Sequence, residues 1–241
     1  MQIMAAKAHP ASRYLEHLDE VEGWLSPHSA AFIADLANLQ TELGILGSLG
    51  EIGVHMGKLF ILLRLSAQAG EKCFAIDVFN DQHLNVDFSG AASREAFLRN
   101  VELWVGTAHD LHLIQASSLT VSPNDVLKEG GRARMVSVDG GHTAECALND
   151  LSLAEGVLAE HGIVVLDDFF NAYWPGVATG ATRYLQSSKS RLKPFMISPN
   201  KIFLAFSHSH ASYRTWMREH HARYFSKKSL MFDSEVDIFL S

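Results

Sequence analysis

The stretch that decides the fold is Gly50-Glu51-Ile52-Gly53-Val54-His55-Met56-Gly57-Lys58. It follows a short apolar run and precedes a helical pattern, so it predicts the turn between a first strand and a first helix. Gly53 and Gly57 let the backbone pass close to a ligand, and the helix N-terminus beyond them favours a polar or anionic group. Glu51 stands where the dinucleotide fingerprint needs its first glycine. A carboxylate there would repel a pyrophosphate, which argues against a nicotinamide cofactor, and would suit a cationic ligand group.

Outward from this turn, short apolar runs alternate with amphipathic segments. The runs expected to be strands are residues 46–52, 73–76, 111–114, 133–138 and 162–166. The segments expected to be helices are residues 56–69, 93–105, 121–129 and 143–161, the last with an apolar face that includes Leu148. This alternation predicts a doubly wound α/β fold, in which a mostly parallel sheet carries helices on both faces.

The two ends of the chain depart from this alternation. Residues 194–197 and 201–206 predict two strands whose three-residue link is too short for a crossover helix, so the pair must be antiparallel. At the other end, a helix is expected from an N-cap at Ser29 to Leu43. It would lie in an N-terminal helical extension (residues 1–43) ahead of the main domain (residues 44–241).

Two segments near the C-terminus carry weaker signals. Residues 208–228 are expected to form a solvated helix face that includes Arg214. Residues 229–240 look strand-like and could pair across subunits in a homo-oligomer.

Composition excludes several classes of protein. The 241 residues include 20 Lys+Arg and 27 Asp+Glu, so 20 − 27 gives a net charge of −7. This acidity argues against nucleic acid as the main partner. Hydrophobic residues make up 47% of the chain, which excludes disorder, yet no apolar run approaches the roughly 20 residues that span a bilayer. The first ten residues lack the apolar core of a signal peptide, so a cytoplasmic protein without membrane partners is expected.

Acidic residues end three of the expected strands. Asp77 follows the second strand, where a carboxylate can accept hydrogen bonds from both ribose hydroxyls. Asp139 ends the fourth strand, and Asp167 and Asp168 end the fifth. Because parallel strands present their C-terminal ends to one crevice, these three carboxylates should meet and repel one another. A hard divalent cation such as Mg²⁺ would relieve the repulsion, with Asn171 as a further candidate ligand. Alternatively, these acids only cap a helix and form turns.

His142 lies just beyond Asp139 and faces the same crevice. A neutral imidazole there could take the proton from a metal-bound hydroxyl, which makes His142 the candidate catalytic base. The alternative is a helix-capping histidine, or one that holds a carboxylate in place. Glu145 is a second candidate base, although it is more consistent with a solvent-exposed position in the first helical turn.

Together, these residues resemble the S-adenosylmethionine site of class I methyltransferases. The segments Val136-Ser137-Val138-Asp139-Gly140-Gly141-His142 and Val164-Val165-Leu166-Asp167-Asp168-Phe169 are similar to those of metal-dependent sugar and macrolide O-methyltransferases and cephalosporin-hydroxylase-like proteins. There, a strand ending Asp-Gly-x-His precedes a long helix and a strand ending in paired acids. The resemblance covers about residues 44–206. It implies a Rossmann-like seven-stranded sheet, mostly parallel with a C-terminal antiparallel hairpin.

The resemblance also implies roles for individual residues. Glu51, Gly53 and Gly57 would line the methionine part of S-adenosylmethionine, with Asp77 at its ribose. Ser117 or Ser118 would lie near its adenine.

The expected activity is Mg²⁺-assisted methyl transfer to a hydroxyl of a sugar or small natural product. Residues 77–90 and 169–180, which include Trp174, would cover the active site. Hydroxylase-like chemistry or a non-catalytic binding module on the same fold are the alternatives.

Overall fold

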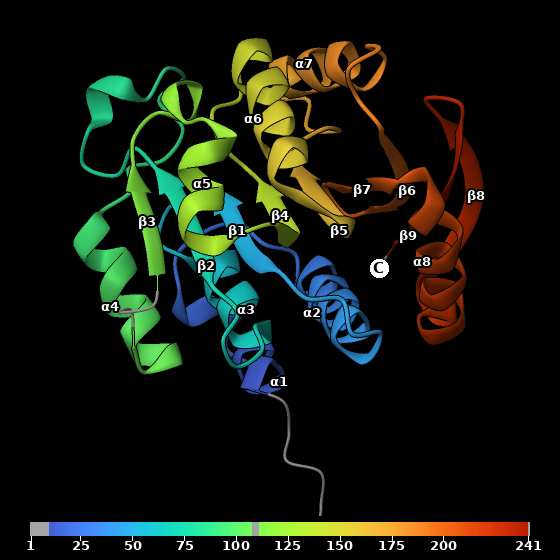
Figure 1. The fold of residues 1–241 in the computed structure, drawn as a ribbon, viewed down its shortest axis with the longest axis horizontal. Helices are drawn as coiled ribbons and strands as arrows, with labels where there is room; N and C mark the ends of the chain where they lie inside the picture. The colour runs from blue at the N-terminus through green and yellow to red at the C-terminus, as the bar shows by residue number, and fades with distance from the viewer. Residues whose placement is uncertain (1–9, 108–110, 241) are drawn as a thin grey trace, which may run out of the picture.

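The computed structural model describes residues 10–107 and 111–240. These residues form a single nine-stranded sheet with helices on both faces (Figure 1). In chain order its strands are β1 (Ser48–Ile52), β2 (Cys73–Asp77), β3 (Leu111–Gln115), β4 (Ala133–Val138), β5 (Leu158–Asp167), β6 (Leu192–Ser198), β7 (Lys201–Phe206), β8 (Phe225–Met231) and β9 (Ser234–Phe239). Their order across the sheet is β3-β2-β1-β4-β5-β7-β6-β9-β8. The doubly wound fold is confirmed, with two more strands than the expected seven.

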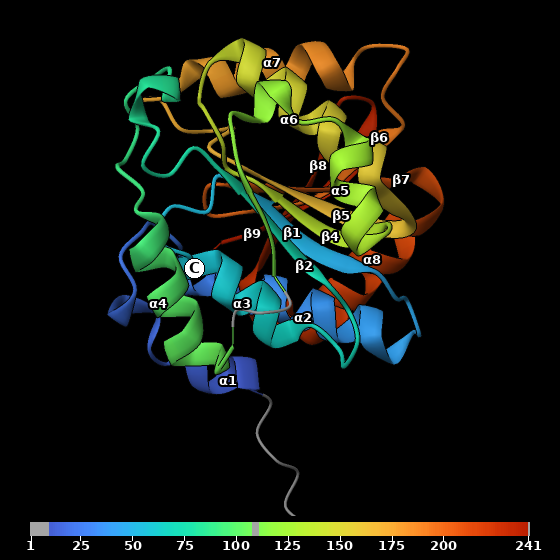
Figure 2. The same cartoon turned by 60° about the vertical axis from the view of Figure 1, so that its left-hand side comes forward.

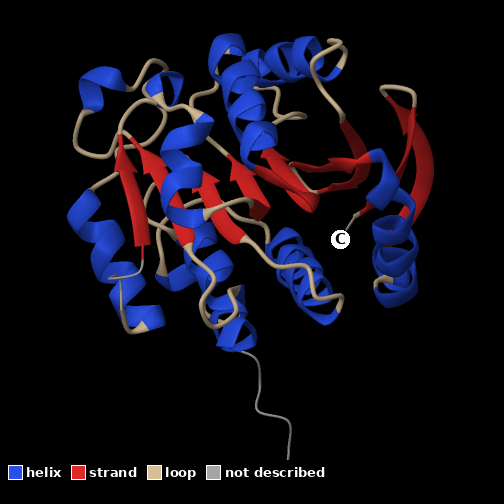
Figure 3. Cartoon of the chain, in the orientation of Figure 1, coloured by secondary structure: helices blue, strands red, loops and turns tan. Residues whose placement is uncertain are grey.

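Helices cover the sheet in two layers. One layer contains α1 (Pro10–Leu15), α2 (Pro27–Glu42), α3 (Lys58–Ser66), α4 (Arg94–Val105) and α8 (Ser207–His220). The other contains α5 (Pro123–Gly130), α6 (Ala144–Val157) and α7 (Pro175–Leu185). Single 3-10 turns lie at Leu18–Glu20, Gln82–Leu84, Ser118–Thr120 and Ala222–Tyr224. In Figures 2 and 3 the sheet separates α6 and α7 above from α1, α2 and α3 below, so each layer encloses its own apolar core.

The central strands are buried because helices cover both of their faces. Every residue of β1 and β4 is buried, as expected for parallel strands between two helical layers. Gly50 in β1 has a local reason: a side chain there would overlap the ring of Phe74 on β2. Several helices begin where capping rules place them. Ser93 and Thr143 each accept a hydrogen bond from a backbone N–H of the first turn.

Two sequence expectations about the helices are wrong. Helix α2 begins at Pro27 with Ser26 at the N-cap, because proline fits the first helical position. Ser29 is instead buried in the helix, where its hydroxyl lies 2.7 Å from that of Ser198. In α6, Leu148 is 38% exposed, and the buried side is formed by residues such as Leu151.

The C-terminal strands explain the larger sheet. β6 and β7 are antiparallel, as expected, and β9 then pairs in parallel with β6. β8 and β9 form an antiparallel hairpin within the chain, so this segment pairs with itself and does not need a second subunit to form strands. Its turn has positive φ at Phe232 and Asp233, 49° and 59°. Since neither residue is the glycine or asparagine typical of such turns, the sequence does not signal the hairpin.

Helix α8 corrects a further expectation. The side chain of Arg214 is only 6% exposed and is not part of a solvated face. Its guanidinium donates to Asp237 at 2.9 Å and to Glu235 at 2.7 Å, both on β9. This contact attaches α8 to the last strand of the sheet.

A fully buried arginine joins the N-terminal helix to the sheet. Arg134 on β4 donates two hydrogen bonds to the Glu71 carboxylate, at 2.8 and 2.9 Å. The same guanidinium donates to the Ala37 carbonyl and the Gln40 side chain of α2, at 3.0 and 3.1 Å. Helix α2 therefore shares the core of the sheet, and a domain boundary after residue 43 stays a prediction.

We expect Arg134→Met to lower the free energy of unfolding by roughly 3–5 kcal/mol, because it leaves the Glu71 carboxylate buried without its partner. Urea unfolding followed by circular dichroism would measure the loss. Arg132→Met is the matched control: Arg132 is exposed and makes one hydrogen bond, to Leu158 O, so its loss should stay within about 1 kcal/mol. Equal losses for both variants would contradict this role of Arg134.

Candidate active site

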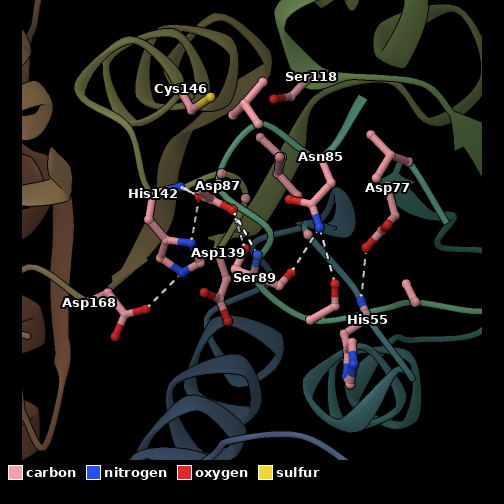
Figure 4. A pocket seen from close by; sticks show the side chains of 18 of the residues that line it. His55, Asp77, Asn85, Asp87, Ser89, Ser118, Asp139, His142, Cys146 and Asp168 are labelled. Atoms are coloured by element: carbon pink, nitrogen blue, oxygen red, sulfur yellow. Dashed lines mark hydrogen bonds and ion pairs between the residues drawn. The ribbon is translucent and has the colours of Figure 1, made fainter. Parts of the chain in front are cut away.

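A cavity of about 810 Å³ lies beyond the C-terminal ends of β1, β2, β4 and β5. The strand order reverses between β1 and β4, and ligands of open α/β sheets bind at such a switch point. Residues that follow these strands line the cavity, among them Gly53, Asp77, Asp139 and Asp168 (Figure 4). The predicted crevice therefore exists and collects the strand-end acids.

The two predicted cofactor glycines have different positions. Gly53 lines the cavity with φ +82°, and a side chain there would overlap the carbonyl oxygen of Asp139. Glycine thus lets the turn after β1 lie directly against the turn after β4. Gly57 does not line the cavity. It precedes α3 with φ +90°, and a side chain there would come within 3.0 Å of the Phe97 ring. Its role in this structure is to let α3 approach α4.

Beneath the cavity lies a layer of buried charge. Glu51 is 2% exposed, and burial followed by the nearby Asp139 carboxylate raises its pKa well above the usual value. Lys201 opens β7 and forms an ion pair with the Asp167 carboxylate. Burial lowers the pKa of Lys201, but Asp167 and Asp139 more than offset this, so the pKa is raised overall. The ammonium therefore remains charged among these acids.

The predicted ribose and adenine residues all line the cavity. Asp77 ends β2, and its two carboxylate oxygens accept hydrogen bonds from the backbone N–H groups of His55 and Phe79, at 2.9 and 2.7 Å. Burial raises the pKa of this carboxyl, and hydrogen bonds from backbone N–H groups offset part of the rise. Ser117 and Ser118 follow β3 on the same side of the cavity.

Asp139, His142 and Asp168 form a cluster of side chains that could hold a metal ion. One potential ligand atom from each lies within 4.8 Å of the others. His142 Nε2 is 3.0 Å from Asp168 Oδ2, and its Nδ1 is 3.0 Å from Oδ2 of Asp87. The imidazole also stacks on Trp174, with ring centres 4.3 Å apart. Three neighbours thus fix this ring at the cavity wall.

The pKa values of the three residues in this cluster are shifted in different directions. Burial raises the pKa of Asp168, but hydrogen bonds from His142, Asn200 and Asn171 outweigh it and lower the pKa to about 2. Burial likewise lowers the pKa of His142, and its two carboxylate partners raise it overall. Burial and then Asp167 raise the pKa of Asp139 well above its usual value. Asp139 is therefore the carboxylate that a bound cation would relieve most.

The remaining candidates take supporting positions. Asp167 lines the cavity, but its carboxylate meets Lys201 and accepts a hydrogen bond from Asn200 at 2.9 Å. Asn171 donates to Asp168 at 2.8 Å and so holds that carboxylate. Glu145 is exposed in the first turn of α6, as expected, and does not line the cavity.

Sequence reasoning missed two residues of this site. Lys201 had a usable signal, because a lysine at the start of an otherwise apolar buried strand needs a carboxylate partner. Asp87 had none: it lies in a long polar loop, and its contact with His142 spans 55 positions in the chain.

Comparison with known proteins agrees with this geometry. Residues 51–169, just under half of the chain, match the family model described as a methyltransferase domain. Residues 51–169 are thus similar to a methyltransferase domain. No curated protein sequence matches it.

Solved structures with the same fold include several O-methyltransferases. The O-methyltransferase NovP is 14% identical with a TM-score of 0.64, covering 81% of this chain and 99% of its own. TomG from Streptomyces achromogenes, involved in tomaymycin synthesis and solved with SAM, is 16% identical with a TM-score of 0.57, covering 85% and 92%. An O-methyltransferase from Bacillus cereus in complex with SAH is 12% identical with a TM-score of 0.54, covering 84% and 92%. At identities this low, the likeness shows only that this chain shares the fold of these methyltransferases.

Within the described part of the chain, none of the helices has both the length and the apolar character that crossing a bilayer requires.

One buried acid near the site makes the protein's stability depend on pH. Asp150 of α6 is fully buried, its side chain lies against Gly140, and its Oδ2 has no hydrogen-bond partner among the described residues. Burial raises the pKa of this carboxyl to about 6. The folded state therefore binds its proton more tightly than the unfolded state, and stability falls as the pH rises from about 4 to above 6.

We expect Asp150→Asn to raise the free energy of unfolding above pH 7 by roughly 2–3 kcal/mol relative to the wild type, because the amide carries no charge to bury. The difference should shrink toward pH 4, where Asp150 is protonated in the folded state. Urea unfolding at several pH values would measure it. A variant that is equally destabilised at every pH would contradict this explanation.

Proposed function

We propose that this methyltransferase transfers the methyl group of S-adenosylmethionine to a hydroxyl oxygen of a small molecule. The observation that carries the proposal is the cavity of about 810 Å³ at the switch point, which brings together two kinds of residue. Gly53 and Asp77 lie on its cofactor side, while Asp139, His142 and Asp168 cluster at a position suited to the acceptor. Structural neighbours solved with SAM or SAH support this cofactor.

The cofactor would bind along the ends of β1, β2 and β3. Its methionine part would pass over Gly53, where the absence of a side chain leaves the backbone accessible. The ribose would meet Asp77, and the adenine would lie beside Ser117 or Ser118. Glu51 lies below the cavity floor, so it would act on the cofactor's ammonium by charge from beneath.

The residues of the acceptor side fit a hard divalent cation such as Mg²⁺. Asp139 and Asp168 offer carboxylate oxygens, and a bound cation would offset the burial and the Asp167 repulsion that raise the pKa of Asp139. Both would hold the ion. Asp167 would support them from behind, because Lys201 already balances its charge. When bound, the cation would lower the pKa of the acceptor hydroxyl.

His142 is the proposed base of the reaction. Both of its ring nitrogens face carboxylates, which raise its pKa, and His142 would accept the proton at Nε2 once Asp168 holds the cation instead of the ring. Stacking on Trp174 fixes the plane of the ring at the cavity wall. The acceptor would be a sugar or small natural product, as several neighbours in natural-product synthesis suggest.

Calorimetric titration with S-adenosylmethionine tests the cofactor. We expect saturable binding that Glu51→Gln and Asp77→Ala each weaken at least about tenfold, because each removes a carboxylate placed for the cofactor. Asp81→Asn is the matched control: Asp81 lies four residues beyond Asp77, pairs with Gln115 and does not line the cavity. Absence of binding by the wild-type protein would overturn the proposed function.

A second experiment tests the acceptor side. With a panel of hydroxylated sugars and natural products, formation of S-adenosylhomocysteine should depend on added Mg²⁺ and be abolished by EDTA. Asp139→Asn and Asp168→Asn should each lower kcat by about 100-fold or more, while cofactor affinity stays within about threefold. Full activity of the wild type in EDTA would refute the role of the cation, while the proposed methyl transfer would still stand.

A further inference from the structure

The loop between β2 and α4 (residues 78–93) lies over the cavity and is folded by its own side chains. Asn85 donates from its amide to the carbonyls of Ser89 and Gly90, at 3.3 and 3.1 Å. Gln82 donates to the carbonyl of Phe79 at 2.6 Å. The loop therefore holds a defined shape and presents a defined inner edge to the cavity (Figure 4).

Asp87 of this loop reaches across the cavity to His142. Its Oδ1 accepts hydrogen bonds from the backbone N–H and the hydroxyl of Ser89, at 3.0 and 2.5 Å. Its Oδ2 accepts from the backbone N–H of His142 and lies 3.0 Å from Nδ1 of the same residue. The side chain of Asp87 is 9% exposed, while that of the next residue, Phe88, is 87% exposed.

This contact sets the orientation of the imidazole. Carboxylates lie 3.0 Å from each ring nitrogen, Asp87 at Nδ1 and Asp168 at Nε2, so the two contacts together fix the direction of both nitrogens. Asp87 also holds the backbone of His142, so it fixes both the ring and the turn that carries it. Stacking on Trp174 fixes the plane of the imidazole ring. The carboxylates of Asp87 and Asp168 prevent the ring from rotating within that plane.

We propose that Asp87 is a positioning residue, which holds His142 in the orientation needed for proton transfer. The proposal rests on the proposed function, because it assigns His142 the role of base. Asp87 reaches the site from the β2–α4 loop, whereas His142 and Asp168 follow strands of the sheet. The loop therefore covers the cavity and also supplies the contact that fixes the ring.

The kinetic test compares three variants of the full-length protein. Asp87→Ala should lower kcat by about 10–100-fold, with the KM for S-adenosylmethionine within about threefold of wild type. Asp87→Asn should recover part of this loss, because its amide oxygen can still accept the hydrogen bond from Nδ1.

Asn85→Ala is the matched comparison, since it loosens the loop without removing the carboxylate. It should raise the KM for the acceptor more than it lowers kcat. If Asn85→Ala lowers kcat as much as Asp87→Ala does, loop stability accounts for the effect and the proposal is overturned.

The second readout is the ¹⁵N NMR spectrum of the His142 ring at one fixed pH, assigned by the signals missing from His142→Gln. In the wild type, a carboxylate at each ring nitrogen favours the doubly protonated ring, whose two shifts lie close together, and in Asp87→Ala the two shifts should move apart by several ppm. Unchanged ring shifts together with kcat within twofold of wild type would overturn the proposal. This spectrum needs no acceptor and no cofactor. A wild type that fails to bind S-adenosylmethionine would therefore refute the proposed function without deciding the role of Asp87.

Discussion

A single buried ammonium holds together the acidic end of the sheet. Lys201 lies among Glu51, Asp139 and Asp167, which follow or end three adjacent parallel strands. Carboxylates at this depth repel one another and lose their hydration, so the arrangement requires an internal cation. The rest of the site depends on that balance, because the turns after β1, β4 and β5 can approach closely only where their charges are compensated.

That balance also separates the roles of two adjacent acids. Asp167 points to Lys201 beneath the cavity, whereas Asp168, with φ +60°, accepts a hydrogen bond from Asn171 and lies beside the ring of His142. Both carboxylates accept a hydrogen bond from the Asn200 amide, but only Asp167 pairs with Lys201 and only Asp168 with His142, so one acid belongs to the buried layer and the other to the reacting centre. Asp139 belongs to both, and burial followed by the nearby Asp167 carboxylate raises its pKa well above the usual value.

The outer part of the site is built from loops rather than strands. The β2–α4 loop contributes Asp87, and the segment before α7 contributes Trp174, which stacks on His142. Loops of this kind vary freely in length and composition on one fold, so they determine which acceptor fits. The solved neighbours share the fold at 12–17% identity. Their chemistry therefore informs the proposed reaction class, while the acceptor depends on loops particular to this chain.

The sequence alone determined what depends on local pattern: the alternation of strands and helices, the glycine turn after β1, and the acids at strand ends. Parallel strands share an edge, so spacing was enough to bring Asp77, Asp139 and Asp168 to one crevice. Only the tertiary structure decided which partners these acids take, as in the ion pair of Asp167 with Lys201 and the contact of Asp87 with His142. It also placed β8 and β9 in the sheet. These features join residues far apart in the chain or depend on backbone conformations with no typical residue signature, so no local periodicity encodes them.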